Sequence, residues 1–94
     1  RLRTEIQTTL DQWMTANTEV ASFNQTILPA AKSAVDTATR GFEMGKFNFL
    51  DVLDAQRTLI SARTQYIQAI AEATDAWVRI ERIFGDVALL TRTP

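Results

Sequence analysis

The 94-residue sequence contains no cysteine and no histidine. Without cysteine there can be no disulfide and no thiolate nucleophile, and without histidine there is no imidazole base. An ordinary zinc site is excluded for the same reason. Carboxylates are the remaining groups for metal binding or acid–base chemistry. The sequence offers no further set of polar groups that could form a catalytic cleft with them. We therefore expect no enzyme activity and no cofactor.

Charge and hydropathy exclude further classes of protein. Ten basic and 11 acidic residues are interspersed and give a net charge of -1, so we expect no nucleic-acid partner. The longest apolar runs span only a few residues, whereas a membrane-spanning helix needs about 20. The sequence begins at Arg1 without a signal-peptide pattern, and we interpret it as a fragment of a longer protein.

Glycine and proline are scarce, and their positions divide the chain. Long stretches without either residue predict an all-α fold, a long antiparallel helical hairpin. We expect one helix over about 2–43, a tip turn over about 44–47, a second helix over about 48–84 and an exit segment over 85–94. Pro29 predicts a kink or local break in the first helix. Gly85 is expected to end the second helix in the left-handed conformation.

The start of the second helix carries a recognisable signal. Asn48 is a favourable N-cap, and Asp51 stands at the third helical position, as in a capping box. Phe47 precedes the cap and is placed to pack onto Val52. These features predict that the helix begins directly after the turn.

Apolar residues at helical spacing predict the packing faces. The first helix carries one seam: Ile6, Leu10, Trp13, Val20, Ile27, Ala31, Ala34 and Ala38. The second helix carries two: Leu53, Ile60, Ile67, Ile70, Trp77 and Phe84; and Phe49, Val52, Leu59, Tyr66, Ile70, Ala73, Trp77, Ile80 and Phe84. Alanine also recurs at Ala55, Ala62, Ala69 and Ala76.

Two seams indicate a helix with a neighbour on each side, because a lone hairpin needs only one. In an isolated hairpin we expect the seam of Leu59, Tyr66, Trp77 and Ile80 to be exposed and to cause self-association.

The rest of the second helix is polar from end to end: Asp51, Asp54, Thr58, Ser61, Gln65, Gln68, Glu72, Asp75, Arg79 and Arg82. Such a line is typical of a helix with one side in water, either outside a bundle or inside a hollow one. Asp51 and Asp54 begin this line. Asp51 has a structural reason for its position, since an acidic residue in the first turn complements the helix dipole. Asp54 lies one turn further along the helix, where the helix dipole does not explain an acidic residue.

The stretch GFEMGKFNFLDVLDAQRTL at 41–59, followed by Ala62-Arg63 and Gln65-Tyr66, resembles the second periplasmic hairpin of the TolC family of outer-membrane efflux proteins. The resemblance extends over the whole chain and is greatest to the CzcC-like heavy-metal efflux branch. It implies an outer-membrane protein whose periplasmic portion is a trimeric α-barrel. Each helix of that barrel contacts a neighbour on both sides.

The resemblance also implies roles for particular residues. Asp51 and Asp54 match aspartates that ring the narrowed channel entrance and govern cation passage. Gly45, Lys46 and Phe47 fall at the tip that meets a periplasmic adaptor protein. The implied partners are the sister protomers of a homotrimer, the adaptor and, through it, an inner-membrane pump.

One residue departs from the family pattern. Phe42 stands where TolC has a tyrosine whose hydroxyl helps to hold the entrance closed, and phenylalanine has no such donor. That role is therefore not carried over. The alternative function is a helical-hairpin coiled-coil interaction or scaffold module without a transport role, in which the polar line is simply solvated.

Overall fold

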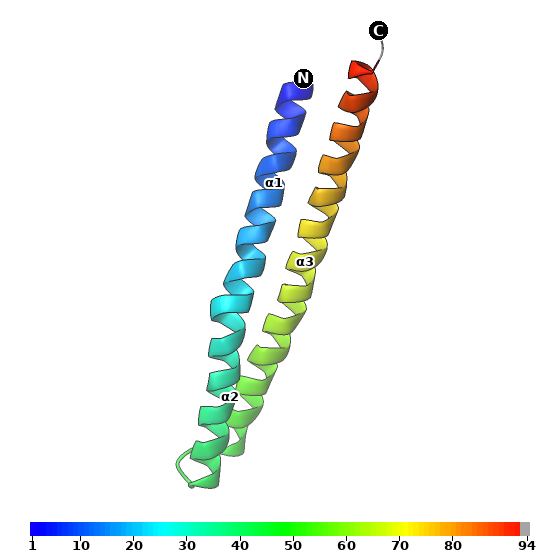
Figure 1. Ribbon diagram of the computed structural model, residues 1–94. Helices are drawn as coiled ribbons and strands as arrows, with labels where there is room; N and C mark the ends of the chain where they lie inside the picture. Colours follow the sequence, from blue (N-terminus) through cyan, green and yellow to red (C-terminus); the bar gives the residue numbers. More distant parts are fainter. Residues whose placement is uncertain (93–94) are drawn as a thin grey trace.

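The computed structural model describes residues 1–92, which form one long helical hairpin. The first arm consists of α1 (Leu2–Ser22), a π-helical turn η1 (Phe23–Ile27) and α2 (Leu28–Glu43), and the second arm is α3 (Phe49–Thr91). The arms run antiparallel, with both termini at one end and the turn at the other (Figure 1). The molecule measures 77 × 16 × 13 Å. The all-α hairpin predicted from the sequence is confirmed.

The two arms meet along one seam, which we call the hairpin seam. On α3 its buried and half-buried residues are Val52, Ala55, Leu59, Ala62, Tyr66, Ala69, Ala73, Ala76, Ile80, Ile83 and Val87. On the first arm they are Ile6, Thr9, Trp13, Ala16, Val20, Phe23, Leu28, Ala31, Val35 and Ala38. Most of the fully buried side chains are alanines, whose small size lets two helices pack closely.

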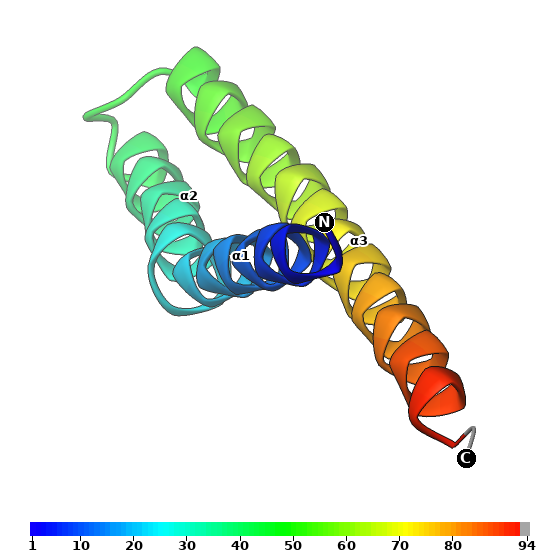
Figure 2. The same cartoon turned by 90° about the horizontal axis from the view of Figure 1, so that it is seen from above.

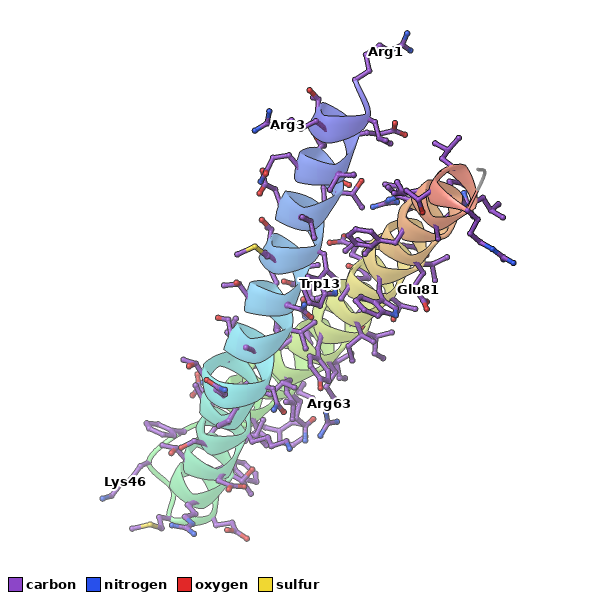
Figure 3. All side chains as sticks on the ribbon, turned by 45° about the horizontal axis from the view of Figure 1, so that its top comes forward. Arg1, Arg3, Trp13, Lys46, Arg63 and Glu81 are labelled. Atoms are coloured by element: carbon purple, nitrogen blue, oxygen red, sulfur yellow. The ribbon has the colours of Figure 1, made fainter. Side chains whose placement is uncertain are left out.

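Aromatic contacts fix the alignment of the arms at three levels. Trp13 lies between the arms (Figure 3), with its ring centroid 5.5 Å from that of Trp77. The ring centroids of Phe23 and Tyr66 are 6.4 Å apart, and a Phe42–Phe49 contact closes the end next to the turn. Aromatic pairs at these separations add about 0.5–1.5 kcal/mol beyond the area they bury.

The capping box predicted at the start of α3 is confirmed. The backbone N–H of Asp51 donates to Asn48 Oδ1 at 3.2 Å, and the backbone N–H of Asn48 donates to Asp51 Oδ2 at 3.1 Å. Each bond satisfies a backbone donor that has no partner within the helix. Asn48 itself is extended, at φ -90° and ψ 169°, so the chain turns sharply into α3.

The irregularity expected near Pro29 is the π-helical turn η1, and the helix is not broken there. The backbone N–H of Leu28 bonds to the carbonyl of Phe23, five residues earlier instead of four. The helix axis changes direction between α1 and α2 (Figure 2). Because one extra residue fits into this turn, half of the predicted seam beyond it is wrong, whereas Ala31 and Ala38 are buried as predicted. Ile27 and Ala34 are exposed, and Leu28 and Val35 take their places.

The helix end predicted at Gly85 is also wrong. α3 continues to Thr91, and Gly85 does not adopt a positive φ. Gly85 lies opposite the hairpin seam, while Ile83 and Val87 continue that seam as half-buried residues. A glycine inside a helix costs about 1 kcal/mol relative to alanine and does not by itself end the helix. Of the expected exit segment, residues 93 and 94 lie outside the described residues.

Candidate functional site

The hairpin seam divides the rest of α3 into two sides of opposite character. In an α-helix each residue is rotated by about 100° from the one before it. Six of the residues that follow seam positions are large and apolar and form, with Phe49, an apolar side: Phe49, Leu53, Ile60, Ile67, Ile70, Trp77 and Phe84. Polar residues interrupt this side at Gln56, Arg63, Thr74 and Glu81. The residues that precede seam positions form a polar side: Asp51, Asp54, Thr58, Ser61, Gln65, Gln68, Glu72, Asp75, Arg79 and Arg82. The hairpin thus has a hydrophilic face and a hydrophobic one.

The first arm contributes to the same polar face. Arg79 Nη2 donates to Gln12 Oε1 at 3.1 Å, a hydrogen bond that joins the arms across this face. Further along, a hollow at the π-helical turn is bordered by Glu19 and Ser22 from the first arm and by Gln68 and Glu72 from α3. A solvated surface therefore extends over both arms, as expected for a wall that faces water.

Most of the apolar side of α3 is left uncovered by the hairpin, and Leu53 is its half-buried member. Ile60 and Ile67 are 61 % and 66 % exposed, and Ile70, Trp77 and Phe84 are also exposed. The expectation about which residues would be exposed is correct for Trp77 and wrong for the other three. Leu59 and Tyr66 are half-buried and Ile80 is buried, because they belong to the hairpin seam. A row of large exposed apolar side chains marks a surface that another helix can cover.

Asp51 and Asp54 both lie on the polar face, as predicted, and both are exposed. Their surroundings differ. The Asp51 carboxylate is engaged in the capping box, whereas the hydrogen bond at Asp54 involves its backbone carbonyl, which accepts from Thr58 Oγ1 at 3.1 Å. The side chain of Asp54 thus has no part in capping the helix, and its position on the polar face calls for another explanation.

The turn is held by backbone hydrogen bonds that converge on Gly41. Its carbonyl accepts from the N–H of Lys46 at 2.7 Å and of Phe47 at 3.1 Å. Gly45 directly follows the C-cap residue Met44 and has φ +73°, a conformation that L side chains rarely adopt. The backbone conformation of the turn therefore favours glycine at position 45, whatever contacts the turn makes. Lys46 is exposed and Phe47 is 45 % exposed.

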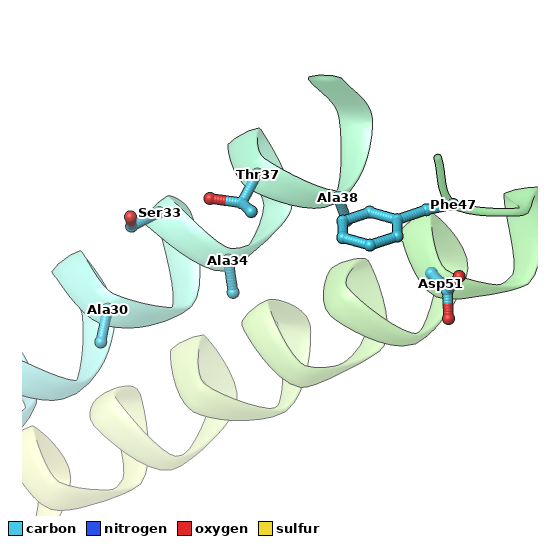
Figure 4. Close-up of a pocket in the computed structure, with 7 residues that line it drawn as sticks. All are labelled: Ala30, Ser33, Ala34, Thr37, Ala38, Phe47 and Asp51. Atoms are coloured by element: carbon cyan, nitrogen blue, oxygen red, sulfur yellow. The ribbon is translucent and has the colours of Figure 1, made fainter. Parts of the chain in front are cut away.

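A groove beside the turn brings two of the predicted residues together. Phe47 and Asp51 form its wall at the turn, and small side chains of α2 form the rest (Figure 4). Its volume is about 540 Å³, and the residues from α2 are Ala30, Ser33, Ala34, Thr37 and Ala38. Neither Asp54 nor Lys46 lines it. The small residues of α2 at helical spacing are the sequence signal that could have revealed this groove.

The part of the chain that the structure describes contains no group of three or more acidic residues placed to hold a metal ion. None of its helices is long and apolar enough to cross a membrane. A cation that met Asp51 and Asp54 would therefore meet two carboxylates per chain, and a higher number of ligands would need several chains.

The comparisons with known proteins agree with this architecture. The model of the family described as outer membrane efflux protein matches residues 1–86. The chain belongs to this family. It is also 45 % identical over 75 residues to the cobalt-zinc-cadmium resistance protein CzcC of Cupriavidus metallidurans. That match covers 80 % of this chain and 18 % of the relative, so the chain spans about a fifth of that protein. No solved structure matches.

Membership of the outer membrane efflux family confirms the resemblance found in the sequence. It also confirms the predicted location, the periplasmic portion of an outer-membrane protein. The family is one of efflux channels and not of enzymes. The similarity to a cobalt-zinc-cadmium resistance protein supports the heavy-metal branch within it.

Proposed function

We propose that this hairpin forms the periplasmic tip of an outer-membrane efflux duct whose cargo is heavy-metal cations. The observation that carries the proposal is the arrangement of α3. Its apolar side is exposed and offers a surface to a second helix, while its polar face begins with Asp51 and Asp54 at the turn. A helix that lies between two neighbours and has one wetted face suits the wall of a tube.

The aspartates would act as an electrostatic entrance. Several copies around one axis place carboxylates at Asp51 and Asp54 in a confined space, and their fields add there. Rings of acidic side chains favour cations and oppose anions in channels. Because the Asp51 carboxylate also caps α3, we expect Asp54 to contribute more than Asp51 to the attraction of cations. Sister protomers in a homotrimer supply the other copies.

The turn would provide the contact to a periplasmic adaptor, and through it to an inner-membrane pump. Lys46 projects from the end of the hairpin that is remote from both termini (Figure 3), and neither Lys46 nor Phe47 belongs to the hairpin seam. Gly45 keeps the turn tight through its positive φ. Among the three, Lys46 offers a charge and Phe47 an apolar ring to a partner.

The entrance is tested in the full-length protein reconstituted in planar bilayers. Asp54→Asn should lower the cation-to-anion permeability ratio and weaken block by multivalent cations, and Asp51→Asn/Asp54→Asn should lower them further. Asp75→Asn is the matched control, since Asp75 lies on the same polar face but far from the turn. Unchanged selectivity in the double variant, with trimers intact, would show that both residues belong to an ordinary solvated surface and have no role at the entrance.

The adaptor contact is tested separately by Lys46→Glu. This variant reverses one exposed charge and leaves the backbone bond from its N–H in place. It should weaken pull-down of the adaptor and reduce metal tolerance of the cells, whereas Lys32→Glu, on α2 away from the turn, should not. Normal adaptor binding together with normal tolerance in Lys46→Glu would favour the alternative of a helical scaffold module without this contact.

A further inference from the structure

The hairpin seam of the first arm contains a single irregular step. Its residues alternate by three and four positions in both α1 and α2, as in any antiparallel helical pair. At η1 the step from Phe23 to Leu28 is five positions. The hydrogen bond from Leu28 N–H to the Phe23 carbonyl spans the same five residues. The π-helical turn therefore absorbs one residue that a regular α-helix could not place without rotating everything after it.

Without that turn, a second set of residues would occupy the seam. Counting on from Phe23 in regular steps of four and three leads to a different row on α2: Ile27, Ala30, Ala34 and Thr37. All are exposed in the structure, and all are apolar or small. Each directly precedes a present seam residue, so a rotation of α2 by about 100° would exchange the two rows.

Pro29 explains why the π-helical register is the one observed. In a regular α-helix its ring would crowd the carbonyl of Gln25, and its missing N–H would leave that carbonyl without a partner. The wider π-helical turn lies immediately before Pro29, at the place where such a helix irregularity accommodates a proline. Both rows of α2 consist of apolar or small residues, and Pro29 biases the choice of which row faces α3.

We propose that α2 is a two-register element, which rotates about its axis when η1 converts to regular α-helix and back. In the second register Ile27 and Ala34 replace Leu28 and Val35 in the hairpin seam. The groove beside the turn would then disappear, because Ala30, Ala34 and Thr37, which line it, would face α3. The switch is a property of the hairpin and does not depend on what passes through a duct.

The structure also shows where the motion would be felt. Gly41, at the end of α2, is buried and carries both hydrogen bonds that anchor Lys46 and Phe47. Rotation of α2 would turn this anchor away from its present position, so the turn would rearrange as the groove closed. A local change at η1 is in this way linked to the tip, several helical turns away.

The two registers can be distinguished by disulfide trapping in an otherwise cysteine-free full-length protein. Val35 and Ala55 are both the third seam position beyond the Phe23–Tyr66 contact, so Val35→Cys/Ala55→Cys should cross-link in the observed register. Ala34→Cys/Ala55→Cys should cross-link in the second register, because disulfides demand close and well-oriented Cβ atoms. For a minor state, we expect the second pair to react at about 0.1–10 % of the rate of the first.

Two further variants separate a register change from local fluctuation. Deleting Asn24 in the Pro29→Ala background removes the extra residue and makes the step from Phe23 to Leu28 regular without crowding the Gln25 carbonyl, which locks the present seam. It should suppress the Ala34→Cys/Ala55→Cys cross-link by about tenfold or more and leave the other pair unaffected. Pro29→Ala removes the bias against regular α-helix and should accelerate the Ala34→Cys/Ala55→Cys cross-link. No Ala34→Cys/Ala55→Cys product, or a product that is insensitive to the deletion, would overturn the proposal.

Discussion

The ring of Phe47 occupies the space that a side chain on Gly41 would fill. The turn is consequently folded back onto the end of α2, and Gly41 is buried although it stands next to the exposed tip. A Cβ at this position would overlap the ring, so Phe47 would have to move. Because Phe47 also walls the groove, the packing of this pair determines the shape of the tip.

Gly41→Ala should therefore destabilise the hairpin by about 1–3 kcal/mol, the usual range for overpacking. Denaturant unfolding followed by circular dichroism measures the change. Adding Phe47→Ala to Gly41→Ala should recover most of the loss, since it removes the ring that the new methyl group meets. If the double variant is as unstable as the sum of the two single variants, the clash is not the cause.

Gly85→Ala is the matched opposite case. Gly85 lies inside α3 without a positive φ, and a methyl group added there would meet no neighbouring side chain of the described residues within 4 Å. Alanine should therefore stabilise α3 by about 0.5–1 kcal/mol through its higher helix propensity. The same unfolding assay should show the midpoint moving upward. A downward shift would mean that α3 ends near Gly85 in solution, as the sequence alone suggested.

The capping box gives a third expectation. Asn48→Ala removes the side-chain acceptor for the N–H of Asp51 and should cost about 0.5–2 kcal/mol. Asn17→Ala, at an exposed position in the middle of α1, should be neutral or slightly stabilising, because alanine is the better helix former there. Comparable losses in the two variants would show that Asn48 does not act as a cap.

The sequence predicts the features that depend on neighbouring residues. Asn48 and Asp51 identify the start of α3 because a capping box is complete within four residues. The order of helices and the polar line with Asp51 and Asp54 follow from helical periodicity in the same way. Periodicity also shows that α3 has more apolar surface than one partner can cover.

The features that the sequence does not reveal depend on a choice between nearly equal alternatives. At η1, Ile27 and Leu28 are both apolar, as are Ala34 and Val35, so composition cannot show which pair faces α3. The π-helical turn decides this through backbone hydrogen bonding around Pro29. Similarly, glycine often ends a helix, and Gly85 has a low helix propensity. The packing of Val87 in the hairpin seam outweighs this propensity, and α3 continues past Gly85.

The exposed apolar side of α3 leads to the last prediction. The isolated 94-residue hairpin should self-associate as its concentration rises, because this side buries apolar area only against another molecule. Ile67→Glu should abolish association in sedimentation equilibrium without loss of helix, since Ile67 is 66 % exposed and outside the hairpin seam. Gln68→Glu, the adjacent residue on the polar face, adds the same charge and should leave association intact. If both variants weaken association equally, net charge and not the apolar side controls it, and the inference that α3 packs against a second neighbour loses its support.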